Sequence, residues 1–96
     1  MNTISKNYFV YLLRCRDGTL YTGTTNDLRR RVQQHNAGKG ARYTVGRRPV
    51  ALVYVEICAS RSEALRREAA LRKLSHRQKL SLSESTASEF LLPAEQ

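Results

Sequence analysis

Residues 8–23 read YFVYLLRCRDGTLYTG, and this stretch decides the fold because it predicts a β-hairpin. Its first half is aromatic and branched, Asp17-Gly18 forms a turn signal, and an extended run that includes Tyr21 follows. Tyr11 and Tyr21 therefore fall on the two strands of one predicted hairpin.

The length of the turn decides where the two tyrosines point. With a two-residue turn, Tyr11 and Tyr21 would project from opposite faces, because side chains alternate along a strand. A three-residue loop over 16–18, with Gly18 left-handed, instead pairs Tyr11 with position 23 and places both tyrosines on one face. A single site formed by both tyrosines therefore requires the longer turn or an equivalent bulge.

Outward from the hairpin, the chain predicts a helix, a loop and a third strand. Asn26 is the expected N-cap of the helix, and Gly38 is expected to close it. Residues 38–49 are rich in glycine and cations and are typical of a loop. Residues 50–55, VALVYV, are apolar enough for a strand that is covered on both faces.

The second half of the chain predicts two more helices. Ser60 and Glu63 have the spacing of a capping box, which opens a helix through about Leu74, and a last short helix begins near residue 75. The order of elements is strand-strand-helix-loop-strand-helix-helix. We therefore expect an α+β fold, in which helices flank a small three-stranded, mainly antiparallel sheet.

A chain of 96 residues forms one domain, which we place at residues 8–80. Residues 83–96 contain no lysine or arginine, and we expect them to form a weakly ordered acidic tail. Cys15 and Cys58 belong to no Cys-x-x-Cys pair, so they predict buried thiols in a reducing compartment rather than a zinc site. The short apolar run near the N-terminus is typical of neither a signal peptide nor a membrane span, so a cytoplasmic protein is expected. We expect it to be a monomer.

The net charge of +9, from 17 basic and 8 acidic residues, indicates a polyanionic partner. Seven cations and no acid lie between Leu28 and Arg48. A charge run is most often a solvated helix face, but here no acids at a spacing of three or four residues balance the arginines. We therefore expect phosphate contacts and base stacking in the loop. The residues that we expect to bind nucleic acid are Lys39, Arg42, Tyr43, Arg47 and Arg48.

Two polar residues lie on the apolar stripe of the first predicted helix. Arg31 comes three residues after Leu28 and four before His35, so it faces the sheet. An arginine beside an apolar stripe is partly desolvated, which makes it effective at holding a phosphate. For His35 taken alone, a hydrogen-bonded core histidine is the more common interpretation.

Glu68 falls at the centre of the apolar arc of the helix that follows the third strand. A carboxylate that points at a core must be paired or must coordinate a cation. The spacing alone leaves two interpretations open, an ion pair with Arg31 or a ligand for a divalent metal.

The ordered set of these residues resembles the GIY-YIG endonuclease superfamily over residues 8–80, and in particular its small stand-alone bacterial members, the YhbQ-like group. Phe9-Val10-Tyr11 stands at the first motif and Tyr21-Thr22-Gly23 at the second, and a late-helix glutamate follows. The first motif lacks its glycine, and Thr24 stands where some relatives carry lysine. The other matching positions are Arg31, His35 and Glu68.

The resemblance implies a role for each matching residue. Tyr11 and Tyr21 correspond to the two motif tyrosines, one of which acts as general base on the attacking water. Arg31 corresponds to the arginine that stabilises the transition state, and His35 to a position that assists proton transfer or orients a tyrosine. Glu68 corresponds to the single protein ligand of a divalent cation, Mg²⁺ or Mn²⁺.

The expected function is therefore a divalent-metal-dependent DNA endonuclease in DNA repair or recombination, with no other small-molecule cofactor. A small basic domain has little surface for reading sequence, so we expect cutting directed by DNA structure or by single strands. One alternative is a nucleic-acid-binding module that has kept the fold but lost efficient catalysis. Another, a ribosome-associated basic protein, leaves the tyrosine, arginine, histidine and glutamate set unexplained.

Overall fold

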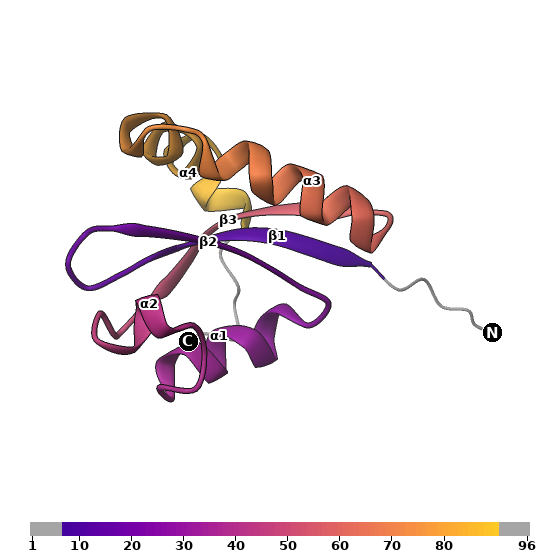
Figure 1. Ribbon diagram of the computed structural model, residues 1–96. Coiled ribbons are helices and arrows are strands. Elements are labelled where there is room, and N and C mark those ends of the chain that lie inside the picture. Colours follow the sequence, from indigo (N-terminus) through magenta and orange to yellow (C-terminus); the bar gives the residue numbers. More distant parts are fainter. Residues whose placement is uncertain (1–6, 91–96) are drawn as a thin grey trace.

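The computed structural model describes residues 7–90, and the side chains of residues 7–84. Three antiparallel strands form one sheet in the order β2-β1-β3 (Figure 1). Their bounds are β1 Tyr8–Arg14, β2 Leu20–Thr25 and β3 Ala51–Cys58. Strand β1 lies in the middle of the sheet, with β2 paired to one of its edges and β3 to the other. The expected α+β fold is confirmed.

The hairpin closes through the longer turn. The amide N–H of Gly18 donates to Cys15 O at 2.9 Å, and that of Cys15 donates to Thr19 O at the same distance. Gly18 has φ +87°, the left-handed conformation that glycine adopts without a steric penalty. The register pairs Leu13 with Tyr21 and Tyr11 with Gly23. The three-residue loop is confirmed, and both tyrosines lie on one face.

Helices α1 (Leu28–Asn36) and α2 (Arg42–Val45) lie on the tyrosine face of the sheet (Figure 1). The expected cap on Asn26 was wrong by one residue. Asp27 is the N-cap, and its carboxylate accepts from the amide of Arg30 at 3.1 Å. Thr25 favours this start, because its hydroxyl accepts from the Asp27 amide at 3.1 Å. Gly38, at φ +82°, ends the helix as expected.

Helices α3 (Arg61–Arg72) and α4 (His76–Phe90) cover the opposite face (Figure 1). The capping box begins α3, since the Ser60 hydroxyl accepts from the Glu63 amide at 3.1 Å. The return bond from the Glu63 carboxylate goes to the amide of Ala59, one residue earlier than usual. Among the described residues, no helix has the length and apolar character that crossing a membrane requires.

The last helix is longer than the short helix expected from about residue 75. Helix α4 continues to Phe90 instead of ending before residue 83, and the chain contains no glycine or proline between His76 and Phe90 to stop it. Residues 91–96 of the expected tail lie outside the described residues.

The middle strand has a core on each of its faces. Val10 and Leu12 pack with residues of α3, whereas Tyr11 and Leu13 pack toward α1, with Val32 of that helix against them. Each such buried side chain contributes roughly 1.5–3 kcal/mol to folding. The sheet therefore lies between two layers of helices, with one core on each of its faces. Both cysteines are buried thiols, as expected.

Candidate active site

A hydrogen bond between Tyr11 and His35 lies at the centre of the tyrosine face. Tyr11 comes from the middle strand and is 1% exposed, and His35 comes from the last turn of α1 and is fully buried. The Tyr11 Oη atom lies 3.1 Å from His35 Nε2. Burying two polar groups without partners would cost several kcal/mol, so their pairing is what makes the arrangement stable.

Thr44 in α2 determines which ring nitrogen of His35 carries the proton. The Thr44 hydroxyl donates to Ala41 O at 2.9 Å, so its oxygen is the acceptor for His35 Nδ1, 2.8 Å away. The Nδ1 atom therefore carries the hydrogen, and Nε2 presents a lone pair. It follows that the Tyr11 hydroxyl donates to Nε2. The chain of bonds runs from Tyr11 through His35 and Thr44 to the backbone.

Burial sets the protonation states of both groups. Desolvation, followed by the charge of Arg31, lowers the pKa of His35 to about 4, so the imidazole is neutral near pH 7. Desolvation also raises the pKa of Tyr11 to about 12, with the nearby Arg31 guanidinium acting against that rise. Tyr11 is therefore a neutral phenol bonded to a neutral, proton-accepting imidazole.

Two glycines make room for this pair. A Cβ atom on Gly23 would collide with the Tyr11 hydroxyl and lie 2.6 Å from its Cζ atom. A Cβ atom on Gly40 would collide with His35 Nδ1 and lie 2.9 Å from its Cα atom. Because Gly23 has no side chain, the Tyr11 phenol can lie against β2. Because Gly40 has none, the loop can pack directly on the His35 imidazole.

Tyr21 lies beside the buried pair and extends it toward the surface. Its ring centroid is 6.4 Å from that of Tyr11 and 5.2 Å from that of His35. On its outer side Tyr21 stacks on Tyr43, with centroids 5.8 Å apart. The structure therefore brings both predicted tyrosines and the predicted histidine into one cluster.

Arg31 lies at the edge of this cluster. Its side chain is half-buried, and its Nη1 atom donates to Gln34 Oε1 at 3.0 Å. The guanidinium is close enough to act on the pKa of both Tyr11 and His35. Of the two interpretations of Glu68, the ion pair with Arg31 is wrong.

Glu68 forms an ion pair with Arg72, one turn further along α3, with 2.8 Å between Oε2 and Nη2. This pairing follows from their spacing of four residues on one helix. The Glu68 side chain is 17% exposed, and its charge acts to raise the pKa of Tyr11. The carboxylate on α3 is therefore a minor part of the electrostatic environment of Tyr11, after desolvation and Arg31.

A divalent metal is compatible with this arrangement. The described residues contain no group of three or more His, Cys, Asp or Glu side chains that would enclose an ion. Mg²⁺ commonly takes one or two carboxylates and keeps its other positions for water and phosphate oxygens. A half-buried carboxylate at the edge of the site meets that requirement, so Glu68 is a suitable ligand.

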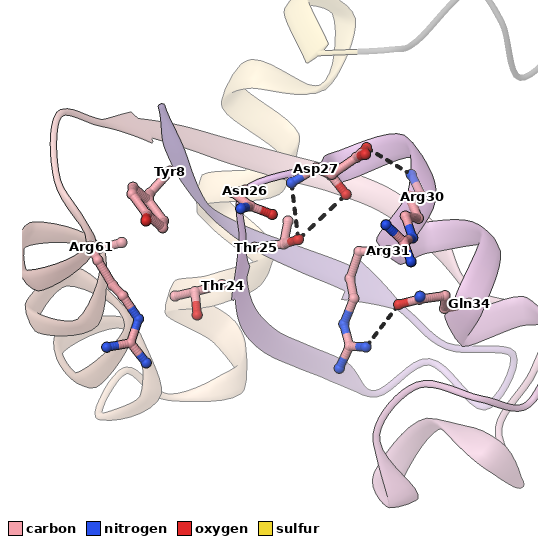
Figure 2. A pocket seen from close by; sticks show the side chains of 10 residues that line it. Tyr8, Thr24, Thr25, Asn26, Asp27, Arg30, Arg31, Gln34 and Arg61 are labelled. Carbon is pink, nitrogen blue, oxygen red and sulfur yellow. Dashed lines mark hydrogen bonds between the residues drawn. The ribbon is translucent and has the colours of Figure 1, made fainter. Parts of the chain in front are cut away.

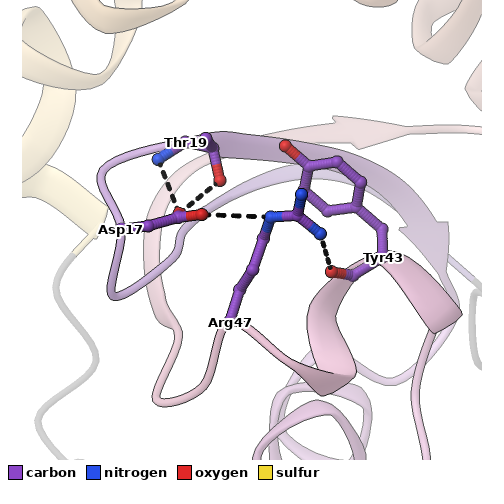
Figure 3. A network of polar contacts seen from close by, with 4 residues as sticks. All are labelled: Asp17, Thr19, Tyr43 and Arg47. Carbon is purple, nitrogen blue, oxygen red and sulfur yellow. Dashed lines mark hydrogen bonds and ion pairs between the residues drawn. The ribbon is translucent and has the colours of Figure 1, made fainter.

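Two of the predicted loop cations hold the loop together, and Figure 3 shows the contacts of one of them, Arg47. Arg47 donates to Asp17 Oδ2 at 3.1 Å and to Tyr43 O at 2.7 Å, and its guanidinium lies 4.0 Å from the centre of the Tyr43 ring. Arg48 donates to Val45 O at 2.7 Å. These bonds fasten the α2 segment to the hairpin turn and hold Tyr43 against Tyr21. The exposed members of the predicted set are Lys39, Arg42 and Tyr43.

Sequence reasoning missed Thr44. It lies nine residues from His35, across a loop with no periodic pattern, and a threonine in such a loop has no local signal that relates it to a histidine. Its hydrogen bond to the backbone is a property of the folded loop alone.

Comparisons with known proteins give the family and the fold of the chain. The family model for the GIY-YIG catalytic domain matches residues 7–81. A UPF0213 protein of Staphylococcus haemolyticus is 51% identical over 77 residues, which cover 80% of this chain and 94% of that protein. A UPF0213 protein of Halobacterium salinarum is 53% identical over 75 residues, with 78% and 97% covered.

Two solution NMR structures have the same fold. A UPF0213 protein of Bacillus halodurans superimposes with a TM-score of 0.55 at 44% identity, over 84% of this chain and 86% of that one. A protein of E. faecalis superimposes with a TM-score of 0.59 at 38% identity, over 96% and 97% of the two chains. These relatives are small stand-alone proteins of similar length, and the chain belongs to the GIY-YIG family.

Proposed function

We propose that the protein is a divalent-metal-dependent endonuclease that hydrolyses phosphodiester bonds in DNA. The observation that carries the proposal is the buried chain of hydrogen bonds from Tyr11 through His35 to Thr44. Hydrolysis needs a group that takes a proton from the attacking water, and these hydrogen bonds offer the proton of Tyr11 an acceptor on the side away from the surface. The family membership supports a nuclease role.

In the proposed reaction Tyr11 takes the proton from water while its own proton passes to His35 Nε2. A phenol with a pKa of about 12 is protonated near pH 7. Tyr11 can therefore take a proton from water only if its own proton passes to an acceptor. Nε2 of His35 is the acceptor within reach, and Thr44 receives the Nδ1–H bond that keeps Nε2 available. Because a pKa of about 4 makes His35 a weak base, the transfer to Nε2 must be coupled to the arrival of the proton from water. Tyr11 rather than Tyr21 is therefore the proposed base, and Tyr21 orients the cluster by packing on both rings.

Arg31 holds the phosphate during the reaction. Charge builds up on the phosphate oxygens in the transition state, and a half-buried guanidinium offers paired N–H donors to them. Glu68 would hold the divalent cation. A divalent cation held there would neutralise charge on the phosphate and on the leaving oxygen.

DNA with branched or single-stranded regions is the proposed substrate, with little sequence preference, in the setting of repair or recombination. The proposed contacts are electrostatic and stacking contacts, which read no sequence. Arg47 and Arg48 hold the loop and offer their remaining N–H groups to phosphates. The other proposed contact residues are Lys39, Arg42 and Tyr43.

One observation favours a second candidate, a DNA-binding module with weak catalysis. Arg72 pairs with Glu68 at 2.8 Å and competes with a metal for the same carboxylate. The two candidates differ in whether the purified protein cuts DNA.

The test incubates the protein with labelled duplex, branched and single-stranded DNA, in Mg²⁺ or in EDTA. We expect metal-dependent nicking that is lost in Glu68→Gln and Arg31→Gln, with binding in EDTA retained by Glu68→Gln. The control Glu84→Gln removes an exposed carboxylate on α4 and keeps full activity. Equal nicking by wild type and Glu68→Gln refutes the proposal, and metal-independent binding without nicking supports the second candidate.

A further inference from the structure

A polar cleft of about 460 Å³ lies next to the candidate active site (Figure 2). It is formed where β2 ends, between the first turn of α1 and the first turn of α3. Its size is in the range of clefts that hold small ligands. The lining side chains that carry the argument are Thr24, Asn26, Arg30, Arg31, Gln34 and Arg61.

The cleft has a net positive charge, because three arginines and one aspartate line it. Of the ion pairs found among the described residues, none involves Arg30, Arg31 or Arg61. The one acid that lines the cleft is Asp27, whose carboxylate is engaged as the α1 N-cap. Three guanidinium groups therefore face one polar space, which favours an anionic ligand.

Arg31 and Arg61 can donate hydrogen bonds to an anion in the cleft from two sides. In Figure 2 the guanidinium groups of Arg31 and Arg61 point the same way, on either side of the Thr24 hydroxyl. Arginines offer forked N–H donors, and a hydroxyl adds a further donor between them. This is the donor pattern that binds a tetrahedral phosphate.

Arg61 occupies a position at which the helix dipole disfavours a positive charge. It is the first residue of α3, where the helix dipole favours an anion and opposes a cation. Its exposed side chain has no carboxylate partner among the described residues that would offset this position. A bound phosphate would supply the missing negative charge.

Arg31 connects the cleft to the candidate active site. It lines the cleft, and its guanidinium also acts on the pKa of both Tyr11 and His35. A DNA strand whose scissile phosphate lies at Tyr11 would therefore extend from Arg31 into the cleft. We propose that the cleft binds the neighbouring phosphate of the same strand, held by Arg61, Thr24 and Arg30. This inference rests on the proposed function.

Binding of a short single-stranded oligothymidylate, measured in EDTA over a series of salt concentrations, tests the cleft without any cleavage. Arg61→Gln is expected to weaken binding roughly threefold to tenfold at low salt and to reduce the slope of log K against log salt by about 0.7. Arg66→Gln is the matched control, because it removes the same charge from an exposed position on α3 outside the cleft. Its effect is expected to be clearly smaller.

An NMR titration locates the effect. The amide signals of Thr24 and Asn26 are expected to shift when the oligonucleotide is added to wild type, and to shift clearly less in Arg61→Gln at the same oligonucleotide concentration. Equal losses in Arg61→Gln and Arg66→Gln overturn the proposal. So does a response of these amides to inorganic phosphate but not to the oligonucleotide, which would indicate a site for a free anion. The nicking assay fails or succeeds separately, so loss of the proposed function and loss of this subsite are distinguishable.

Discussion

The hydroxyl oxygen of Tyr11 lies 3.1 Å from Nε2 of His35, although 24 residues separate them in the chain. The pair forms because the three-residue hairpin loop points Tyr11 toward α1, and because the helix period points His35 back at the sheet. Both groups are buried, so their hydrogen bond is shielded from bulk water.

Replacing Thr44 tests the orientation of the imidazole. Thr44→Val leaves the His35 Nδ1–H without an acceptor, which we expect to cost about 1–3 kcal/mol of stability and to let the proton move to Nε2. We expect nicking to fall at least tenfold, because the acceptor for the Tyr11 proton is lost. Thr44→Ser keeps the hydroxyl and restores both. Nitrogen NMR of the His35 ring reports the tautomer, and an unchanged Nδ1–H form in Thr44→Val contradicts the assignment.

Replacing Gly23 tests the close approach of Tyr11 to the edge strand. Gly23→Ala forces the phenol away from its place, and we expect a loss of about 1–3 kcal/mol in unfolding free energy together with most of the activity. Gly46→Ala is the control, since its new methyl group meets no atom within 4 Å and its φ is −88°. Urea unfolding measures both variants, and equal stability of the two would exclude the steric explanation.

Acid is expected to destabilise the fold through His35. The unfolded chain takes up this proton near pH 6.5, whereas burial holds the folded pKa at about 4. As the pH falls from 6.5 to 4, the unfolded state therefore binds a proton at His35 that the folded state does not bind. The free energy of unfolding decreases by at most about 3 kcal/mol. His35→Gln should show a shallower decrease than wild type, and His76→Gln, at an exposed site, the wild-type decrease. Equal pH dependence in all three would disprove the role of His35.

Removing Arg72 tests its competition with a metal at Glu68. Arg72→Gln takes away the cation that pairs with the carboxylate, so we expect the half-saturating Mg²⁺ concentration for nicking to fall about two- to fivefold. Arg66→Gln, on the same helix, keeps the wild-type requirement. A higher requirement in Arg72→Gln would instead mean that the ion pair orients Glu68 for the metal.

Two loop arginines separate DNA contact from loop stability. Arg42 is exposed, and we expect Arg42→Gln to reduce the salt slope of duplex binding by about 0.9 with no loss of stability. Arg48→Gln should reduce the slope similarly and also lower stability by about 1 kcal/mol, because it removes the donor to Val45 O. Thermal unfolding of both variants, measured alongside binding, tests whether only Arg48→Gln is destabilised. Equal stability losses in the two variants would contradict this expectation.

Much of this protein follows from local sequence patterns. The left-handed Gly18, the closure of α1 at Gly38 and the capping box at Ser60 were all predictable, because each depends on the conformation of a few adjacent residues. The position of both tyrosines on one face also followed, once the turn length was chosen, from the alternation of side chains along a strand.

Only the tertiary structure decided which partner each polar side chain has. Glu68 was equally compatible with Arg31 or a metal from its spacing, and the fold pairs it with Arg72. Arg47 was expected to contact DNA, yet its position also lets it bridge Asp17 in the hairpin turn. Hydrogen bonds depend on distances of about 3 Å, and differences that small are set by the packing of whole elements rather than by residue order. The sequence thus determined the faces on which Tyr11 and His35 lie, and packing determined that they meet.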